Sequence, residues 1–514
     1  MPDSTAPQAP PAPARPKRRH DLDALRGFAM LLGIGLHTAL AFFPTFWPVQ
    51  DATSSSDGPY DEFLLAVHGF RMPLFFLLSG FFTAMLWRRR GLPALLKHRR
   101  QRVALPLAIG FVTIVPLMNW VSERASADQF DNLSAAVFFQ NPTAVENLLD
   151  DGVDPDEVRG EEGETPLHLA ALVDNAGLAE LLLDAGANPF AVDDDGDAPF
   201  GYAYFAGSED VADVLVDYGF PDVRAAGTDW EDLEGWGFGE PDLEEDLGLD
   251  SWITSFHHLW FLWFLLWLVA GFAVVAVLVE WRKGQNTASL PGGAQWPRRL
   301  MWSLLPLTIL PQLAMGEGGV FPVFGPDTST GLIPLPHVLL YYALFFAFGA
   351  LMYGRRGRDG ELIVETIGRY WWAILSLTVV IVFPIALVLT FPPGDAWLLA
   401  SVGQVVYAWA MCIGLIGLFR QFLSKKRPRI RYLSDSSYWL YLAHLPLIIV
   451  VQSWIREWDL PSGVKFLGVT AGVTVVLLIS YQLFIRYTPI GTMLNGKRTR
   501  PRGSTTVTAG PQGR

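Results

Sequence analysis

Residues 18–44 read RRHDLDALRGFAMLLGIGLHTALAFFP, and this stretch decides the class of protein. It is apolar over about 20 residues, the length that crosses about 30 Å of hydrocarbon as a helix. It nevertheless carries Arg26 and, eleven positions on, His37. A charged or titratable side chain in hydrocarbon costs several kcal/mol unless it faces a protein interior or a wet cavity. The stretch therefore predicts a membrane-spanning helix with a functional site along it.

Similar apolar stretches recur along the chain. Of the 514 residues, 51% are hydrophobic and only 17% are charged, and 19 are Trp. The single cysteine, Cys412, lies within one such stretch and cannot form an intrachain disulfide. We predict an all-α, polytopic membrane protein of about ten transmembrane helices, at residues 25–45, 62–86, 103–121, 256–280, 300–315, 334–353, 370–391, 397–419, 433–453 and 464–486.

Basic residues fall on alternate loops between these spans, as in RPKRRH, RRRGLPALLKHRRQR and RQFLSKKRPRIR. By the positive-inside rule, both termini are expected on the cytoplasmic side of the membrane. We expect this membrane to be a bacterial inner membrane. A removed signal peptide is the competing interpretation of the first span. That span, however, lacks a clear small-residue cleavage site and is too long for the apolar region of a signal peptide.

Residues 122–250 differ from the rest in charge and periodicity. They hold 34 of the 51 acidic residues and three Arg, which leaves 35 Lys and Arg against 17 acids elsewhere. GETPLHLAALVDNAGLAELLLDAGANP begins at Gly163, and a similar segment begins 33 residues later at Gly196. This period, with TPLHLA at the start of a helix, is typical of ankyrin repeats, whose stacked helix pairs bury each other's apolar faces. We expect an ankyrin α-solenoid at 130–224, inserted between helices 3 and 4 in an outward-facing loop.

Polar residues of the insert have structural explanations. Thr165 and Pro166 are expected to open a helix, and His168 to bond nearby backbone. The acidic residues lack the spacing of a calcium-binding loop, so we expect a solvated acidic surface and no metal site. The expected organisation is a disordered Pro/Ala-rich tail (1–20), a first membrane part (21–121), ankyrin repeats (130–224), an acidic linker (225–250), a second membrane part (251–490) and a disordered basic tail (491–514).

Polar residues inside the predicted spans lie at two depths. Arg26 lies near the cytoplasmic end of the first span, whereas His37 lies about 16 Å further along the helix. Three or four helices can bring other His and Arg side chains to an outer-half cavity near His37. The polar residues expected there or deeper are His68, Arg71, Ser79, His257, His258, Tyr441 and His444. A lone transmembrane histidine can also simply hydrogen-bond another helix, but a guanidinium such as Arg71 at that depth needs a partner or water.

Several motifs occur in the order found in one family. LDALRGFAMLLGIGLHTALAF resembles the first span of the acyltransferase family 3 membrane enzymes, whose mark is an Arg, ten residues and a His, matched by Arg26 and His37. FRMPLFFLLSGFF resembles the second span, and KHRRQR with Pro106 resembles the Arg-x-x-Arg motif, matched by Arg99 and Arg102. HHLWFLWFLLWL and SDSSYWLYLAHLPLII look like the glucan-modifying branch. The resemblance covers about 370 residues of the membrane part; the family's loop is normally short where this chain has its insert.

The resemblance implies an O-acyltransferase that moves an acetyl or succinyl group from cytoplasmic acyl-CoA to a hydroxyl of an extracytoplasmic glycan or other envelope acceptor. It implies catalytic roles for His37, Arg26 and Arg71, with His37 as general base or as an acyl-His intermediate. The implied substrate-binding residues are Arg99, Arg102, His68, Ser79, His257, His258, Tyr441 and His444. Acyl-CoA is then the donor substrate, and no cofactor is bound permanently.

A different class of function also fits the intramembrane polar residues. In a transporter or receptor, the same His and Arg side chains would relay protons or bind an anion while the ankyrin module binds a protein partner. This alternative gives no reason for the Arg-to-His spacing together with Arg-x-x-Arg. Either way, the lipid bilayer is a partner, a protein partner of the repeats is possible, and no nucleic-acid partner is expected. The repeats of an acyltransferase could equally serve as a tether to an extracytoplasmic assembly.

Overall fold

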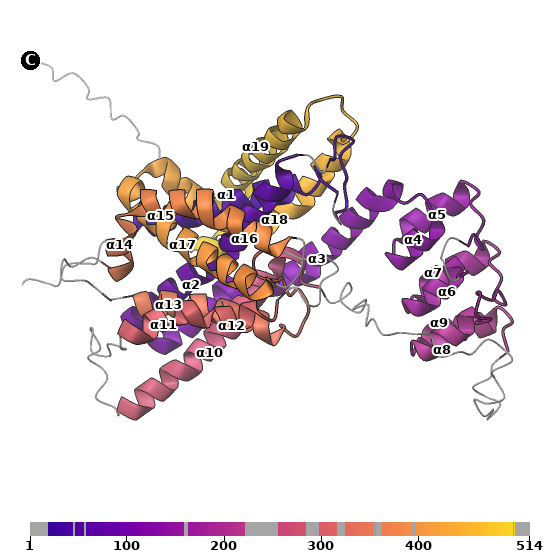
Figure 1. The fold of residues 1–514 in the computed structure, drawn as a ribbon, viewed down its shortest axis with the longest axis horizontal. Helices are drawn as coiled ribbons and strands as arrows, with labels where there is room; N and C mark the ends of the chain where they lie inside the picture. Colours follow the sequence, from indigo (N-terminus) through magenta and orange to yellow (C-terminus); the bar gives the residue numbers. More distant parts are fainter. Residues whose placement is uncertain are drawn as a thin grey trace, which may run out of the picture.

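The computed structural model describes residues 19–44, 47–55, 58–158, 163–221, 255–283, 298–315, 324–353, 355, 362–391, 396–496 and 498. Within these ranges the regular structure is helical and no strand is present. Figure 1 shows a large helical bundle and a smaller helical lobe, with α3 leading from one to the other. The predicted Pro/Ala-rich tail lies almost entirely outside the described residues, so its predicted disorder is untested, and the acidic linker at 225–250 lies wholly outside them. Of the predicted basic tail at 491–514, residues 491–496 and 498 are described, and 491–495 are helical instead of disordered.

The bundle contains helices from both ends of the chain. They are α1 (His20–Ala39), α2 (Tyr60–Arg99), the π-helical turn η1 (Arg100–Ala104), α3 (Leu105–Ser126), η6 (His257–Leu259), α10 (Trp260–Lys283), α11 (Arg298–Leu307), α12 (Ile309–Gln312), α13 (Pro336–Met352), α14 (Ile363–Gly368), α15 (Trp371–Leu377), η8 (Thr378–Val382), α16 (Phe383–Thr390), α17 (Trp397–Leu423), α18 (Pro428–Ile455), α19 (Ser462–Ser480), η9 (Tyr481–Ile485) and α20 (Pro489–Asn495).

Six helical stretches among the described residues are long and apolar enough to cross a membrane. They are Tyr60–Gln129, His257–Arg282, Trp371–Thr390, Trp397–Leu423, Pro428–Ile455 and Ser462–Ile485. The first contains both the second and the third predicted span, because helix continues from α2 through η1 into α3. Each of the ten predicted spans overlaps a helix, and the chain is a polytopic membrane protein, but the number of ten crossings stays a prediction.

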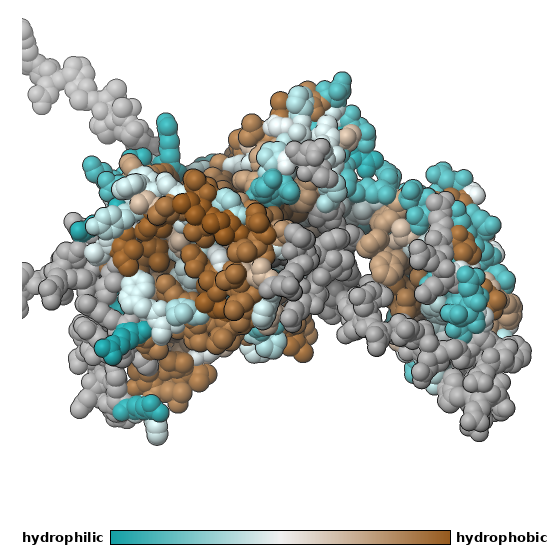
Figure 2. All heavy atoms as spheres, in the orientation of Figure 1, coloured by the Kyte–Doolittle hydropathy of each residue, from teal (hydrophilic) through white to brown (hydrophobic). Residues whose placement is uncertain are grey.

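Apolar side chains cover the outside of the bundle as well as its core. Figure 2 shows a continuous brown, apolar surface on the bundle, whereas the lobe carries many teal, hydrophilic residues. Val380 in η8 and Val388 in α16 are 72% and 75% exposed. A soluble protein rarely exposes an apolar surface of this extent, but lipid tails would cover it.

Close backbone packing joins α2 to α13. A Cβ placed at Gly80 would overlap the carbonyl oxygen of Phe346, and one at Gly349 would overlap that of Leu77. Small residues at such contacts let membrane helices approach closely. Further along α2, Gly91 has φ 78°, which a glycine adopts without steric cost, and the helix changes direction there. The basic segment from Lys97 to Arg102 follows this change of direction.

The loop after α1 is held against the bundle by a buried ion pair. Lys465 Nζ in α19 lies 3.0 Å from each carboxylate oxygen of Asp51 and donates to the carbonyl of Arg456 at 2.8 Å. Both charged side chains are buried. Removing one partner of such a pair is expected to be costly, because the other charge would stay buried and unpaired. The ion pair therefore fixes the loop that carries Trp47.

The lobe consists of short helices in consecutive pairs (Figure 1). They are α4 (Leu133–Phe138), α5 (Pro142–Asp150), α6 (Pro166–Leu172), α7 (Ala176–Asp184), α8 (Pro199–Phe205) and α9 (Glu209–Asp217). Their apolar residues form one core, separate from that of the bundle. Asn141 caps α5 and donates to Glu123 O and Ser126 Oγ of α3 at 2.9 and 2.8 Å. The pairing agrees with a stacked-repeat insert, but the ankyrin assignment itself stays a prediction.

His168 is a buried structural residue of this lobe. Its Nδ1 accepts from the Thr165 backbone N–H at 3.1 Å, and its Nε2–H donates to the Asp197 carbonyl at 2.9 Å. The first bond lies at the start of α6, and the second reaches the segment that precedes α8. One imidazole thus connects two consecutive helix pairs.

Candidate active site

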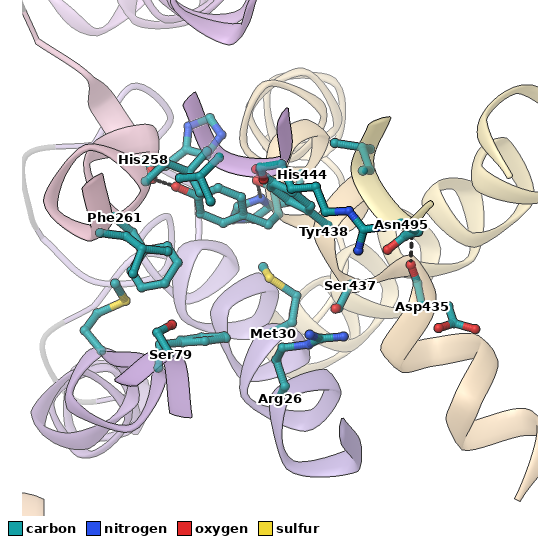
Figure 3. Close-up of a pocket in the computed structure, with 18 of the residues that line it drawn as sticks. Arg26, Met30, Ser79, His258, Phe261, Asp435, Ser437, Tyr438, His444 and Asn495 are labelled. Carbon is teal, nitrogen blue, oxygen red and sulfur yellow. Dashed lines mark hydrogen bonds between the residues drawn. The ribbon is translucent and has the colours of Figure 1, made fainter. Parts of the chain in front are cut away.

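A cavity of about 460 Å³ opens between α1, α2, η1, α10, α18 and α20. Its polar lining residues are Asp23, Arg26, His37, Arg71, Ser79, His98, Arg99, Arg102, His258, Asp435, Ser437, Tyr438, Tyr441, His444, Asn495 and Arg498. In Figure 3, His258 and His444 lie on one side, Arg26 and Ser79 lie on another, and Asp435 and Asn495 lie together at one end. His258 and His444 thus lie apart from Arg26 in the same cavity.

His37 and His444 form a hydrogen-bonded pair at the histidine end. His37 Nδ1 lies 2.9 Å from His444 Nε2, and His444 Nδ1 lies 2.9 Å from the Tyr441 carbonyl oxygen. Because a carbonyl only accepts, His444 carries its proton on Nδ1, and a neutral His444 therefore accepts at Nε2. His37 must then donate from Nδ1. This leaves the lone pair of His37 Nε2 available to a substrate.

The two faces of this pair are enclosed by aromatic groups. Trp47 stacks on His37 with ring centroids 6.2 Å apart and planes inclined by 10°. Its indole N–H donates to Gln452 Oε1 at 2.9 Å, and Gln452 donates in turn to the Thr38 carbonyl at 2.9 Å. His258 packs edge-on against His444 with centroids 5.3 Å apart. The orientation of the His37 ring is therefore fixed from several directions.

His258 lines the cavity and has one buried ring nitrogen without a hydrogen-bond partner. Its Nε2 lies 3.2 Å from the Leu442 carbonyl, which places the proton on Nε2. Its Nδ1 is buried and has no hydrogen-bond partner. Tyr441 donates its hydroxyl to the His258 carbonyl at 2.6 Å and so joins α18 to η6. His258 is thus held by backbone contacts, and its Nδ1 is left without a partner.

Arg71 reaches across from α2 to the surface of α1. A Cβ placed at Gly33 would overlap its guanidinium, so the absence of a side chain at Gly33 makes room for the charge. Arg71 Nε is buried without a hydrogen-bond partner. A buried guanidinium with an unpaired donor is suited to an anion or to a developing negative charge.

The arginine end is built from α1, α2 and η1. Arg26 donates to the carbonyl and the hydroxyl of Ser434 at 2.9 and 3.1 Å, which ties α1 to α18. Arg99 donates to Thr83 Oγ1 at 2.5 Å. The Nε atoms of Arg26 and Arg99 are buried and unpaired, as is Nδ1 of His98. These arginines are partly anchored by the protein, yet retain donors for a polyanionic ligand.

Nine of the eleven site residues expected from sequence line this cavity. They are His37, Arg26, Arg71, Arg99, Arg102, Ser79, His258, Tyr441 and His444. His68 and His257 do not line it. His68 Nε2 lies 2.9 Å from the Pro326 carbonyl, and His257 Nε2 lies 2.6 Å from Asn119 Oδ1 of α3. Adjacent His257 and His258 therefore face different neighbours. Both were predicted to bind substrate, but of the two it is His258 that lines the cavity. The functional roles of all eleven stay predictions.

Other polar lining residues were not expected from sequence. They are Asp23, His98, Asp435, Ser437, Tyr438, Asn495 and Arg498. Asp435, Ser437 and Tyr438 belong to the polar segment SDSSYW of the ninth predicted span, where the cost of burying polar groups was an available signal. Asn495 and Arg498 follow the last apolar stretch and carried no such signal. Within the described part of the chain, no three or more His, Cys, Asp or Glu side chains are grouped so as to hold a metal ion.

Comparisons with known proteins relate this arrangement to an enzyme family. The sequence model of a family described as "Acyltransferase domain" matches residues 19–485, which is most of the chain. Glucans biosynthesis protein C of Escherichia coli (strain K12) is 38% identical over 109 residues, which cover 21% of this chain and 26% of that protein. The protein of the same name from Salmonella heidelberg (strain SL476) gives the same identity and coverage. This chain therefore aligns with about a quarter of the length of these curated relatives.

Proposed function

We propose that this chain, which belongs to the acyltransferase domain family, is a membrane-embedded O-acyltransferase. It moves an acetyl or succinyl group from cytoplasmic acyl-CoA to a hydroxyl of an extracytoplasmic glycan or other envelope acceptor. The observation that carries the proposal is one cavity lined at one end by Arg26, Arg99 and Arg102 and at the other by His37 and His444. A polyanionic donor with a long arm would occupy both ends at once.

The arginine end suits the phosphates of coenzyme A. Guanidinium groups match phosphate oxygens geometrically, and they keep their charge in a partly buried site. Since Arg26 and His37 are eleven residues apart on α1, the cavity extends at least about 16 Å along that helix. The donor arm would follow this length and bring the thioester to the histidine end.

At the histidine end, His37 Nε2 takes the proton of the acceptor hydroxyl as the hydroxyl oxygen attacks the thioester carbonyl. A new C–O bond forms, and negative charge collects on the carbonyl oxygen. Collapse of this tetrahedral intermediate breaks the C–S bond, and the proton on His37 passes to the sulfur of coenzyme A. His444 supports this cycle as a positioning residue, because its Nε2 keeps the His37 Nδ1–H in place.

Arg71 is the candidate group for stabilising the developing oxyanion. Its unpaired donor lies in the wall that also contains Ser79, and it is held in place against Gly33. A preorganised donor of this kind is typically worth about 10²–10³-fold in rate. Alternatively, the same guanidinium would bind the free carboxylate of a succinyl group. In that case Arg71 would favour succinyl over acetyl as the transferred group.

The class of acceptor is proposed from the relatives. Their printed name concerns glucans, so a glucan is the first acceptor to test. The lobe of α4–α9 is proposed to be an ankyrin-type module on the extracytoplasmic side, where it would bind a protein partner near the acceptor.

The test follows thioester loss in purified protein supplied with labelled acetyl-CoA or succinyl-CoA and candidate glucans. His37→Ala is expected to lower turnover by about 10²–10⁴-fold, the usual contribution of a general base. His337→Ala is the matched control, because this histidine does not line the cavity and is not among the eleven expected site residues, and it is expected to retain turnover. His444→Gln, whose amide oxygen can accept from His37 Nδ1, should retain more activity than His444→Ala.

Equal turnover by His37→Ala and wild type would contradict the catalytic assignment. If wild type consumes no thioester with either donor, the transporter or receptor alternative gains support. Label that stays covalently attached to the protein when the acceptor is omitted would favour an acyl-His intermediate over direct general-base transfer.

A further inference from the structure

The segment after η9 forms one wall of the cavity although it lies beyond the matched family region. The family match ends at residue 485, whereas Leu494 and Asn495 of α20 and the following Arg498 line the cavity. The donor end of this cavity is therefore completed by a C-terminal segment that the family match does not include. We call residues 489–496 and 498 the C-terminal wall.

Several contacts hold the C-terminal wall in place. Asn495 Nδ2 donates to the Asp435 carbonyl at 2.9 Å, a bond visible in Figure 3, and lies 3.4 Å from the Tyr481 hydroxyl. A Cβ placed at Gly496 would overlap the guanidinium of Arg102. Arg102 therefore lies directly against the backbone of this wall. One of the three arginines proposed to bind the donor therefore lies against the C-terminal wall.

Arg498 forms an ion pair inside the same site. Its guanidinium nitrogen lies 2.7 Å from Asp435 Oδ1, and the Asp435 side chain is 8% exposed. The other carboxylate oxygen lies 3.8 Å from Arg431 Nε. The hydrogen bond to Asp435 raises the pKa of Arg498, so this group stays charged. Without Arg498, a nearly buried carboxylate would face the part of the cavity where Arg99 and Arg102 meet an anion.

We infer that Arg498 is a further donor-binding residue, which adds a guanidinium to the phosphate site and neutralises Asp435 on its wall. This inference rests on the proposed function, because it takes the nucleotide phosphates of acyl-CoA as the anion at this end. With Arg498 present, the described charges facing this end are Arg26, Arg99, Arg102 and Arg498 against Asp23 and Asp435. The arginines exceed the acids, which favours a polyanion, and loss of Arg498 reduces that excess.

The test measures binding of coenzyme A without an acyl group, so that no turnover occurs, to the full-length protein in detergent. Arg498→Ala is expected to weaken binding about tenfold, the loss of one charge-assisted hydrogen bond. Repulsion by Asp435, which would keep only the more distant Arg431 as a partner, would weaken binding further. Arg498→Lys should lose less, because it keeps the charge. Asp435→Asn added to Arg498→Ala is expected to restore part of the affinity.

Arg486→Ala is the matched control, since Arg486 lies nearby, donates to Gln482 at 2.7 Å and does not line the cavity. Its affinity for coenzyme A should equal that of wild type. Thermal unfolding of each variant separates loss of binding from loss of folding. Arg498→Ala with wild-type affinity overturns the inference and leaves the proposed function intact. The inference also fails if Arg498→Ala binds weakly but Asp435→Asn restores nothing and Arg498→Lys is equally weak. Wild type that does not bind coenzyme A overturns the proposed donor itself.

Discussion

At the scale of single residues, the histidines differ in what their second ring nitrogen contacts. Both ring nitrogens of His168 are used within the lobe. His37 uses Nδ1 for His444 and keeps Nε2 for the cavity, while His258 keeps a buried, unpaired Nδ1. The same side chain is therefore structural in one place and available for chemistry in another, and the hydrogen-bond partners decide which.

Protonation of the buried His168 is expected to destabilise the lobe at acidic pH. Burial lowers the pKa of His168, an effect that the hydrogen bond to the Asp197 carbonyl only partly offsets. The unfolded state then binds a proton at a higher pH than the folded state does, near the ordinary value of about 6.5. Stability is fully present above that value and is lost as pH falls below it. We expect faster hydrogen exchange in α6–α9 at pH 5.5 than at pH 7.5, after correction for the intrinsic pH dependence of exchange.

His168→Asn is the control for this prediction. It removes the titrating group, so the lobe should exchange faster at both pH values but with a smaller difference between them. An undiminished difference in this variant would assign the acid sensitivity to other groups.

Sequence reasoning located much of the site at this scale, for a physical reason. Arg26, His37 and Arg71 stand out because polar groups are costly in apolar spans. The pairing of His37 with His444 could not be predicted, because it depends on how α1 and α18 are placed side by side. Arg498 could not be found either, since nothing in a polar segment after the last span indicates that it turns back onto η1.

At the scale of elements, the apolar spans were predictable because hydropathy is a local property of each segment. The helical stretch from Tyr60 to Gln129, which is interrupted at the non-helical Gly91, was not predictable, since the basic segment between its two spans reads as a loop. The change of direction at Gly91 and the π-helical turn η1 allow that segment to stay helical. Because the segment after Gly91 is helical, Arg99 and Arg102 lie on helical backbone, where their positions are better fixed than on a flexible loop.

Helix packing around the site gives a second prediction. Gly349→Ala would push α13 away from α2, because the new methyl group overlaps the Leu77 carbonyl oxygen, which cannot rotate away. Such overpacking typically costs about 1–3 kcal/mol, so thermal unfolding in detergent should occur at a lower temperature. Gly271→Ala in α10 is the control, since a Cβ there meets nothing within 4 Å. Equal unfolding temperatures for the two variants would contradict the close packing of α2 and α13.

At the scale of the whole molecule, the charge distribution and the length of α3 point to the same topology. The basic residues gather on alternate loops, and η1 lies among them. α3 has 22 residues, or about 33 Å, which is close to the thickness of the hydrocarbon layer. If η1 is cytoplasmic, the acidic lobe at the other end of α3 is extracytoplasmic.

A topology reporter tests this arrangement. A reporter fused within residues 225–250 is expected to read extracytoplasmic, and one fused after Arg514 is expected to read cytoplasmic. The two together fix the orientation of the chain. A cytoplasmic signal from the first fusion would overturn both the span count and the proposed location of the lobe.

The placement of Arg26 and His37 on one straight helix has a consequence for substrate choice. In the proposed function, Arg26 anchors the donor and His37 reacts with it. The fixed backbone rise of α1 sets the distance between these two groups, so this helix would act as a molecular ruler. Discrimination would then depend on the length of the arm between phosphate and thioester more than on the size of the acyl group. A short thioester such as S-acetyl-cysteamine would reach only one end of that ruler.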